Sequence, residues 1–163
     1  MKRLISSFVV IGAVLLMMAG PAQASGAGAV SVTQTFHNAT QTFVPPDPNA
    51  VNPCTGVTGP LTITYNGVAH STFLTSGVGA GTGWATFTAT GTFTFAGADG
   101  VTFTGHFTAW DGQNFNLRNF AATSILVIHG TGSDGSSLTF HDVFHISVSA
   151  SGITLFFDKP TCG

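Results

Sequence analysis

The chain has 163 residues, and only 6% of them are charged, against about a quarter in typical globular domains. Glycine occurs 21 times and phenylalanine 15 times, and glutamate is absent. This composition excludes a coiled coil or helical bundle, which is built largely from Glu and Lys, and it excludes a basic nucleic-acid-binding face. The length predicts one domain, and the many Thr, Val and Phe residues predict strands.

Residues 1–24 have the organisation of a secretory signal peptide. Lys2 and Arg3 supply a positive start, an apolar run follows, and Ala22 and Ala24 provide the small-x-small cleavage pattern. The apolar run is short for a membrane span, so we predict cleavage after Ala24 and a secreted, extracellular chain without membrane association. An uncleaved anchor is the alternative. The mature chain then has two cations against six aspartates, a formal charge of −4, which does not favour binding of nucleic acid.

The two cysteines, Cys54 and Cys162, both lie in the mature part of the chain. An even pair in an exported protein most simply forms a disulfide. A metal–thiolate site would need further ligands, and no other Cys and no His lies within about ten residues of Cys54. We therefore predict a Cys54–Cys162 disulfide.

Alternation of apolar and polar residues predicts about eight strands joined by Gly- and Asp-rich turns. A Pro-rich connection covers 45–60, and the dipeptide Asn66-Gly67 predicts a tight hairpin turn between two strands. The loop 111–119 is polar. The predicted strands are 30–36, 61–65, 68–75, 84–95, 101–110, 120–129, 138–149 and 153–157.

The short connections predict that neighbouring strands pair antiparallel. Long central strands favour a small up-and-down β-barrel with Phe-rich faces inside and Thr-rich faces outside, and a two-sheet β-sandwich is the alternative. We expect residues 25–60 to supply a first strand and the Pro-rich connection, and 61–163 to form the main barrel body. Both parts belong to one domain.

Several histidines raise the question of a metal site. His141 and His145 are spaced as in a zinc-protease helix, but on a strand residues four apart stand about 13 Å from each other and cannot share one ion. If the turn at Asp134-Gly135 contains an extra residue, His129 lies opposite His141; with a plain two-residue turn the two face opposite sides. Scattered surface histidines are the simpler interpretation. We expect no bound metal or other cofactor, and His129 and His141 are the weak candidates.

Asp142 shares a strand face with Phe140 and Phe144, so it points inward if that face is the core. A buried carboxylate must be paired, hydrogen-bonded or protonated. Arg118, the single mature arginine, could pair with it at one mouth of the barrel, with Asp111 beside them. A structural pair or an Asp at the sheet edge is the alternative to a functional role.

Five segments resemble a group of small exported actinobacterial all-β proteins, and this resemblance implies export without implying an activity. Residues 98–100, 108–110 and 114–119 are similar to parts of avidin-type barrels, but only two tryptophans are present. Allene-oxide-cyclase and dirigent-like barrels are similar in size and strand number. The five segments are 36–38, 52–56, 62–67, 130–136 and 157–162.

No Ser-His-Asp or Cys-His set and no phosphate-binding glycine loop is recognisable. The first hypothesis is therefore a non-catalytic secreted protein that binds a small apolar ligand or a protein partner. The second is an isomerase- or cyclase-type barrel enzyme that uses Asp142, Arg118 and Asp111. The third is a structural surface protein with a functional Thr-rich exterior. The expected ligand-contacting residues are Phe103, Phe107, Phe140 and Phe144.

Overall fold

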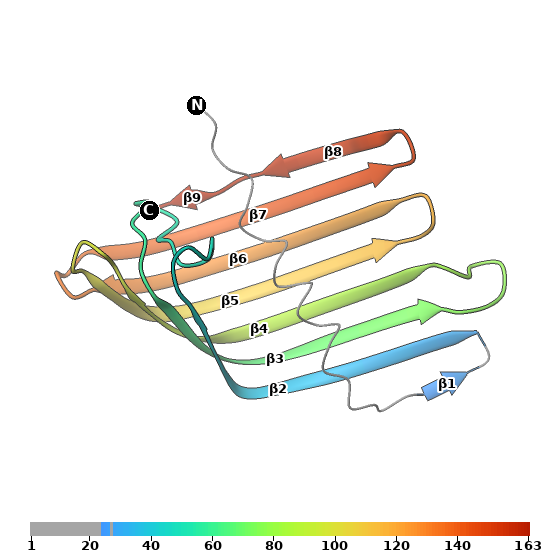
Figure 1. The fold of residues 1–163 in the computed structure, drawn as a ribbon, viewed down its shortest axis with the longest axis horizontal. Helices are drawn as coiled ribbons and strands as arrows, with labels where there is room; N and C mark the ends of the chain where they lie inside the picture. The colour runs from blue at the N-terminus through green and yellow to red at the C-terminus, as the bar shows by residue number, and fades with distance from the viewer. Residues whose placement is uncertain (1–23, 27) are drawn as a thin grey trace.

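The computed structural model describes residues 24–26 and 28–163 and shows an all-β chain. One antiparallel sheet contains every strand, and β1 to β8 follow one another in sequence order, while the short β9 pairs with β7 (Figure 1). Among the described residues, no helix is long and apolar enough to cross a membrane. Apart from Ala24, the predicted signal peptide lies outside the described residues. The strands are β1 (Ala24–Gly26), β2 (Ala29–Phe43), β3 (Leu61–Leu74), β4 (Gly83–Ala96), β5 (Thr102–Phe115), β6 (Phe120–Gly132), β7 (Ser137–Ser149), β8 (Gly152–Asp158) and β9 (Thr161–Cys162).

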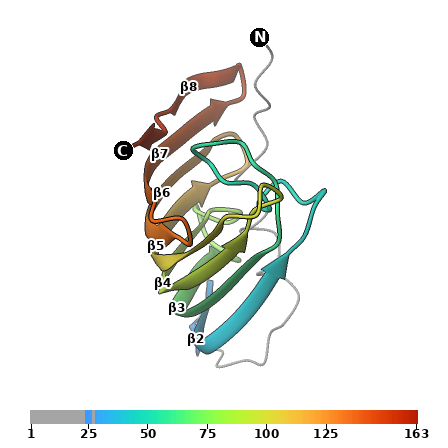
Figure 2. The same ribbon diagram turned by 90° about the vertical axis from the view of Figure 1, so that its left-hand side faces the viewer.

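The sheet is curled but not closed. In the described part of the chain, β8 pairs only with β7 and has no ladder with β1 or β2 at the opposite edge of the sheet. Figure 2 shows the strands in an arc with the segment after β2 on its hollow side. β8 has only 7 residues against 15 in β2, so it offers a much shorter edge for closure. The up-and-down antiparallel order is confirmed, whereas the closed barrel is not confirmed and the two-sheet β-sandwich stays the alternative.

Alternation gives the sheet two chemically different faces. Along β4, the phenylalanines Phe87, Phe93 and Phe95 are buried, while every intervening threonine is exposed. We call the face that carries these phenylalanines the concave face and the opposite one the convex face. On the convex face, hydroxyls satisfy one another across strands, as between Thr42 and Thr62 at 3.1 Å. The prediction of Phe inside and Thr outside is therefore confirmed.

The prediction of a hairpin turn at Asn66-Gly67 is wrong, because β3 continues through these two residues without interruption. The irregularity lies instead in β2, whose register shifts between Phe36 and Ala39. There the Asn66 side-chain oxygen accepts a hydrogen bond from the N–H of Asn38 at 3.0 Å. Gly67 is needed for close packing, since a Cβ atom at this position would lie 2.7 Å from the carbonyl oxygen of Thr88.

The segment 111–119, which was predicted to be a polar loop, also has a different structure. Residues 111–115 continue β5 rather than forming a loop, and the connection to β6 is only 116–119. Asn116 closes this turn, because its side-chain oxygen accepts from the N–H groups of Arg118 and Asn119 at 2.8 and 2.9 Å. Cross-strand pairing with β4 and β6 thus outweighs the low strand propensity of these polar residues.

The core lies at one end of the sheet, under the connection 44–60. A cluster around Phe93, Phe95, Phe103 and Leu138 packs against Cys54 from this connection. The buried Asn52 holds the segment in shape, since its side-chain oxygen accepts from the N–H groups of Cys54 and Thr55.

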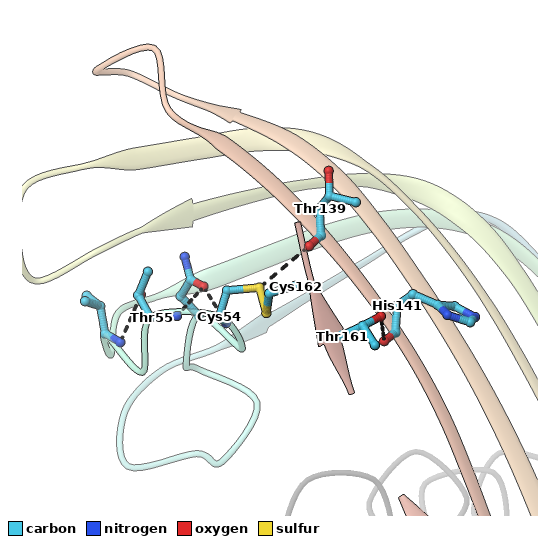
Figure 3. Close-up of a disulfide and its surroundings, with 8 residues drawn as sticks. Cys54, Thr55, Thr139, His141, Thr161 and Cys162 are labelled. Carbon is cyan, nitrogen blue, oxygen red and sulfur yellow. Dashed lines mark hydrogen bonds between the residues drawn. A yellow bond between two sulfur atoms is a disulfide. The ribbon is translucent and has the colours of Figure 1, made fainter. Parts of the chain in front are cut away.

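The predicted disulfide is present between Cys54 and Cys162, with an S–S distance of 2.10 Å. It joins the connection 44–60 to β9, which pairs with the beginning of β7 (Figure 3). The Sγ atom of Cys54 lies 3.7 Å from the carbonyl oxygen of Thr139. The disulfide therefore holds the connection 44–60 against β9, and it joins two cysteines that are 108 residues apart in the chain.

Candidate functional site

The end of the concave face that the connection 44–60 leaves uncovered carries an apolar row. The strand registers place its members directly opposite one another from β2 to β8. Phe73 is 43% and Phe115 36% exposed, although both face the interior of the curl. Their rings stack at 6.2 Å across Gly83, where a Cβ atom would lie 2.5 Å from the Phe115 ring. The row consists of Val30, Phe73, Gly83, Phe115, Phe120, Val148 and Ile153.

The four phenylalanines expected to contact a ligand all lie on the concave face, but in different surroundings. Phe103 and Phe140 are buried at the covered end. Phe107 is half-buried and packs against the cluster around Phe93 and Phe103 and against a second buried cluster, which consists of Ala69, Phe87 and Ala89. Phe144 is half-buried and makes an edge-to-face contact with Phe156 of β8 at 5.8 Å. Phe144 is thus nearest to the open part of the face, and Phe103 and Phe140 are core residues.

Asp142 is on the concave face of β7, as the alternation predicted, and it is only 5% exposed. Its Oδ1 atom is buried without a hydrogen-bond partner. Burial raises the pKa of Asp142 to about 6, and the neighbouring charge and side-chain hydrogen bond of Asp158 contribute further to the rise. A backbone hydrogen bond from Val143 and the charge of His141 act in the opposite direction. These surroundings therefore favour the protonated, neutral form of Asp142.

Asp111 is a further carboxyl group of the concave face, opposite Ser124 in β6. Burial raises its pKa above the usual value, and a hydrogen bond with the Ser124 side chain lowers it in part. Its row also contains Asp158, three strands further along the sheet. At about 4.8 Å per strand this separation is about 14 Å, so Asp111 and Asp158 do not act on the same atom.

Arg118 does not lie beside Asp142. The arginine is exposed in the connection 116–119, next to the open end of the sheet. Asp142 lies opposite Leu126, six residues along β6 from Phe120, which is a distance of about 20 Å. The partner of Asp142 is the carboxyl group of Asp158, and the predicted pairing with arginine is not found in this structure.

The convex face carries a shallow hollow of about 650 Å³ over β4 to β7. Five of its twelve lining residues are threonines, and the others include His106 and His129. The turn before β7 contains the extra residue considered from the sequence, with Gly135 in the left-handed conformation (φ 85°). His129 and His141 therefore share a face, but His129 lies opposite Thr139. The expectation that His129 lies opposite His141 is wrong by two residues.

In the part of the chain that the structure describes, no three His, Cys, Asp or Glu side chains come together to hold a metal ion. His141 projects away from the disulfide, while its backbone oxygen accepts a hydrogen bond from the Thr161 hydroxyl at 3.1 Å (Figure 3). A metal ion bound by the described His, Cys or Asp side chains would therefore have at most two of them as ligands.

Sequence reasoning missed Asp158 as the neighbour of Asp142. The signal that could have found it is the alternation of β8, which puts Asp158 on the same face as Phe156. The pairing itself depends on the register shift between Ser147 and Val148, which places Asp158 opposite Phe144 and which periodicity does not reveal.

Comparisons with the models of known protein families, with curated proteins and with solved structures find no match for this chain.

Proposed function

We propose that this chain is a secreted, non-catalytic binding protein that holds a small apolar molecule at the open end of its concave face. The observation that carries the proposal is the apolar row, in which Phe73 and Phe115 stay substantially exposed although they point into the curl. Contiguous exposed apolar surface in a concave site is typical of ligand binding. A ligand that covers this row removes it from water, and each side chain covered contributes to affinity.

The neighbouring rows restrict the ligand further. The row next to the apolar one contains Gln113, and the row beyond it contains Asp111 and Ser124. An apolar body over the phenylalanines with a hydroxyl or amine group directed toward Asp111 fits this arrangement. The same surface would be the mouth of the predicted barrel if β2 and β8 met.

Binding is tested with a neutral naphthylamine dye whose fluorescence rises in apolar surroundings. Phe73→Ser and Phe115→Ser should each weaken dye binding about five- to tenfold, which corresponds to about 1 kcal/mol for covering the exposed part of one ring. Trp84→Ser is the matched control, because Trp84 is similarly exposed, at 42%, but lies on the convex face next to Gly83. Equal weakening by Trp84→Ser, or no binding by the wild type, would contradict the proposal.

The alternative is an isomerase- or cyclase-type enzyme, and the carboxyl pair favours it. Asp142, with its raised pKa, can exchange a proton near neutral pH, and it lies on the same concave face as the apolar row. Native mass spectrometry of protein purified from its own host would identify a bound molecule. A binding protein returns that molecule unchanged, whereas an enzyme converts it, and Asp142→Asn would then abolish conversion but not binding. Recovery of a stoichiometric protein partner instead would favour the protein-binding form of the first hypothesis.

A further inference from the structure

His106 of β5 and His129 of β6 lie directly opposite each other in the register of the two strands. Both side chains are exposed on the convex face. Directly opposed residues on antiparallel strands have Cβ atoms about 4.5–5.5 Å apart. Two nitrogen ligands at about 2.0–2.1 Å from one ion are themselves separated by about 3 Å, so two imidazoles at this spacing can reach a common ion.

The rings of these two histidines differ from those of His70 and His145 on the same face. Both ring nitrogens of His70 and both of His145 lie within 2.8–3.3 Å of Thr or Ser hydroxyls, which occupies them. Within the described ranges, no hydroxyl or carboxyl group engages the ring of His106 or His129 in this way. Two adjacent imidazoles thus retain free nitrogen lone pairs.

The surroundings select the kind of ion. The hollow that both histidines line contains threonine hydroxyls, such as those of Thr92 and Thr139 in the same row, but no carboxylate. Calcium and magnesium need several oxygen ligands and usually carboxylates, so they do not fit. Neutral imidazole suits copper, nickel and zinc, and of these divalent ions copper binds nitrogen ligands most tightly.

We propose that His106 and His129 form a two-histidine site for a late first-row divalent ion, with Cu²⁺ as the preferred one. The two strands are paired along thirteen consecutive positions, so the spacing of the two Cβ atoms is fixed before the ion arrives. Binding then orders only the two side chains and no backbone segment. The hollow of about 650 Å³ leaves room for water or a small molecule to complete the coordination.

His141 is not part of this site. It is on the same face but lies opposite Val127, which places it diagonally to His129. Diagonal neighbours in a sheet are about 7–8 Å apart, and the side chain of His141 is therefore too far to share the ion with both other histidines. This separation provides a matched control, because His141 is an exposed histidine of the same face.

The test is a titration of the tag-free protein, with its disulfide formed, with Cu²⁺ alone. We expect binding of one equivalent by calorimetry and an electron paramagnetic resonance spectrum with two coupled nitrogens. His106→Gln and His129→Gln should each weaken binding at least about tenfold, which corresponds to about 1.4 kcal/mol. His141→Gln and His145→Gln should leave the affinity unchanged. Both tested positions are exposed, so the apo variants should unfold within about 0.5 kcal/mol of the wild type.

Three results would overturn the proposal. One is a single-nitrogen spectrum at one equivalent of Cu²⁺. Another is an affinity that does not change in His106→Gln and His129→Gln. The third is a loss of affinity in His141→Gln equal to that in His129→Gln, which would place the ion between β6 and β7 instead. The apolar-dye experiment addresses the other face of the sheet, so its outcome is independent of this one.

Discussion

Replacing Asp142 by Asn should stabilise the protein at neutral pH, because it removes a charge that burial and Asp158 both oppose. The pKa of Asp142 is raised from 3.8 to about 6 in the folded state. A group whose folded pKa is raised stabilises the fold fully below its unfolded pKa, and this contribution is lost as pH rises through the folded value. Wild-type stability should therefore fall as pH rises from about 4 to about 6.5.

The size of the effect follows from the shift. A rise of about two pKa units corresponds to at most about 3 kcal/mol. Water at the open side of the concave face screens the charges, so we expect about 1–2 kcal/mol. The side-chain amide of the new asparagine can donate a hydrogen bond to the carboxylate of Asp158. The Oδ1 atom of Asp142 has no hydrogen-bond partner in the wild type, so the substitution breaks no hydrogen bond at this atom. At pH 7.5, Asp142→Asn should thus raise the unfolding temperature by about 3–6 °C.

The assay is urea unfolding at pH 4 and pH 7.5 with the disulfide intact. The gain in Asp142→Asn should be present at pH 7.5 and vanish near pH 4. Asp158→Asn should give a smaller gain, because burial is the larger cause of the shift, and the double variant should gain less than the sum of the two. Asp99→Asn is the control, since the Asp99 carboxylate accepts a hydrogen bond from Val101 in an exposed turn and its loss should not stabilise. An Asp142→Asn protein less stable than wild type at pH 7.5 would mean that a cation faces this carboxylate, and the argument would be wrong.

Three further outcomes are expected. Both cysteines, Cys54 and Cys162, should resist alkylation until the disulfide is reduced. Replacing both by serine should lower the free energy of unfolding by about 4–5 kcal/mol, because the disulfide closes a loop of 108 residues, and urea titration of the double serine variant measures this loss. Intact mass of exported protein should show a mature chain beginning at Ser25, and a retained Met1 would contradict the signal peptide. Gly105→Ala should cost about 2–3 kcal/mol in thermal unfolding, because a Cβ atom there would overlap the backbone of β6, and a loss below about 0.5 kcal/mol would show that the two strands can separate at this point.

The all-β fold class and the chemistry of the two sheet faces could be predicted from the amino-acid sequence alone. A period of two is a local property of an extended chain, so the Thr and Phe positions of β4 could be assigned to opposite sides without knowing any partner strand. The disulfide could also be predicted without the fold, because two cysteines in one chain have a single intramolecular pairing available. Asp142 was correctly assigned to the interior by the same alternation.

The contacts between side chains of different strands are known only from the tertiary structure. Strand registers depend on turn geometry and on irregularities such as the shift between Phe36 and Ala39. A register shift of one residue moves every side chain of a strand to the other face of the sheet. Asn66-Gly67 has a strong local preference for a turn, yet pairing along the whole of β3 on both sides keeps it extended. The proximity of Asp142 to Asp158 depends on the register shift between Ser147 and Val148, and the short β8 leaves the sheet open. These are contacts between distant segments, and no local pattern encodes them.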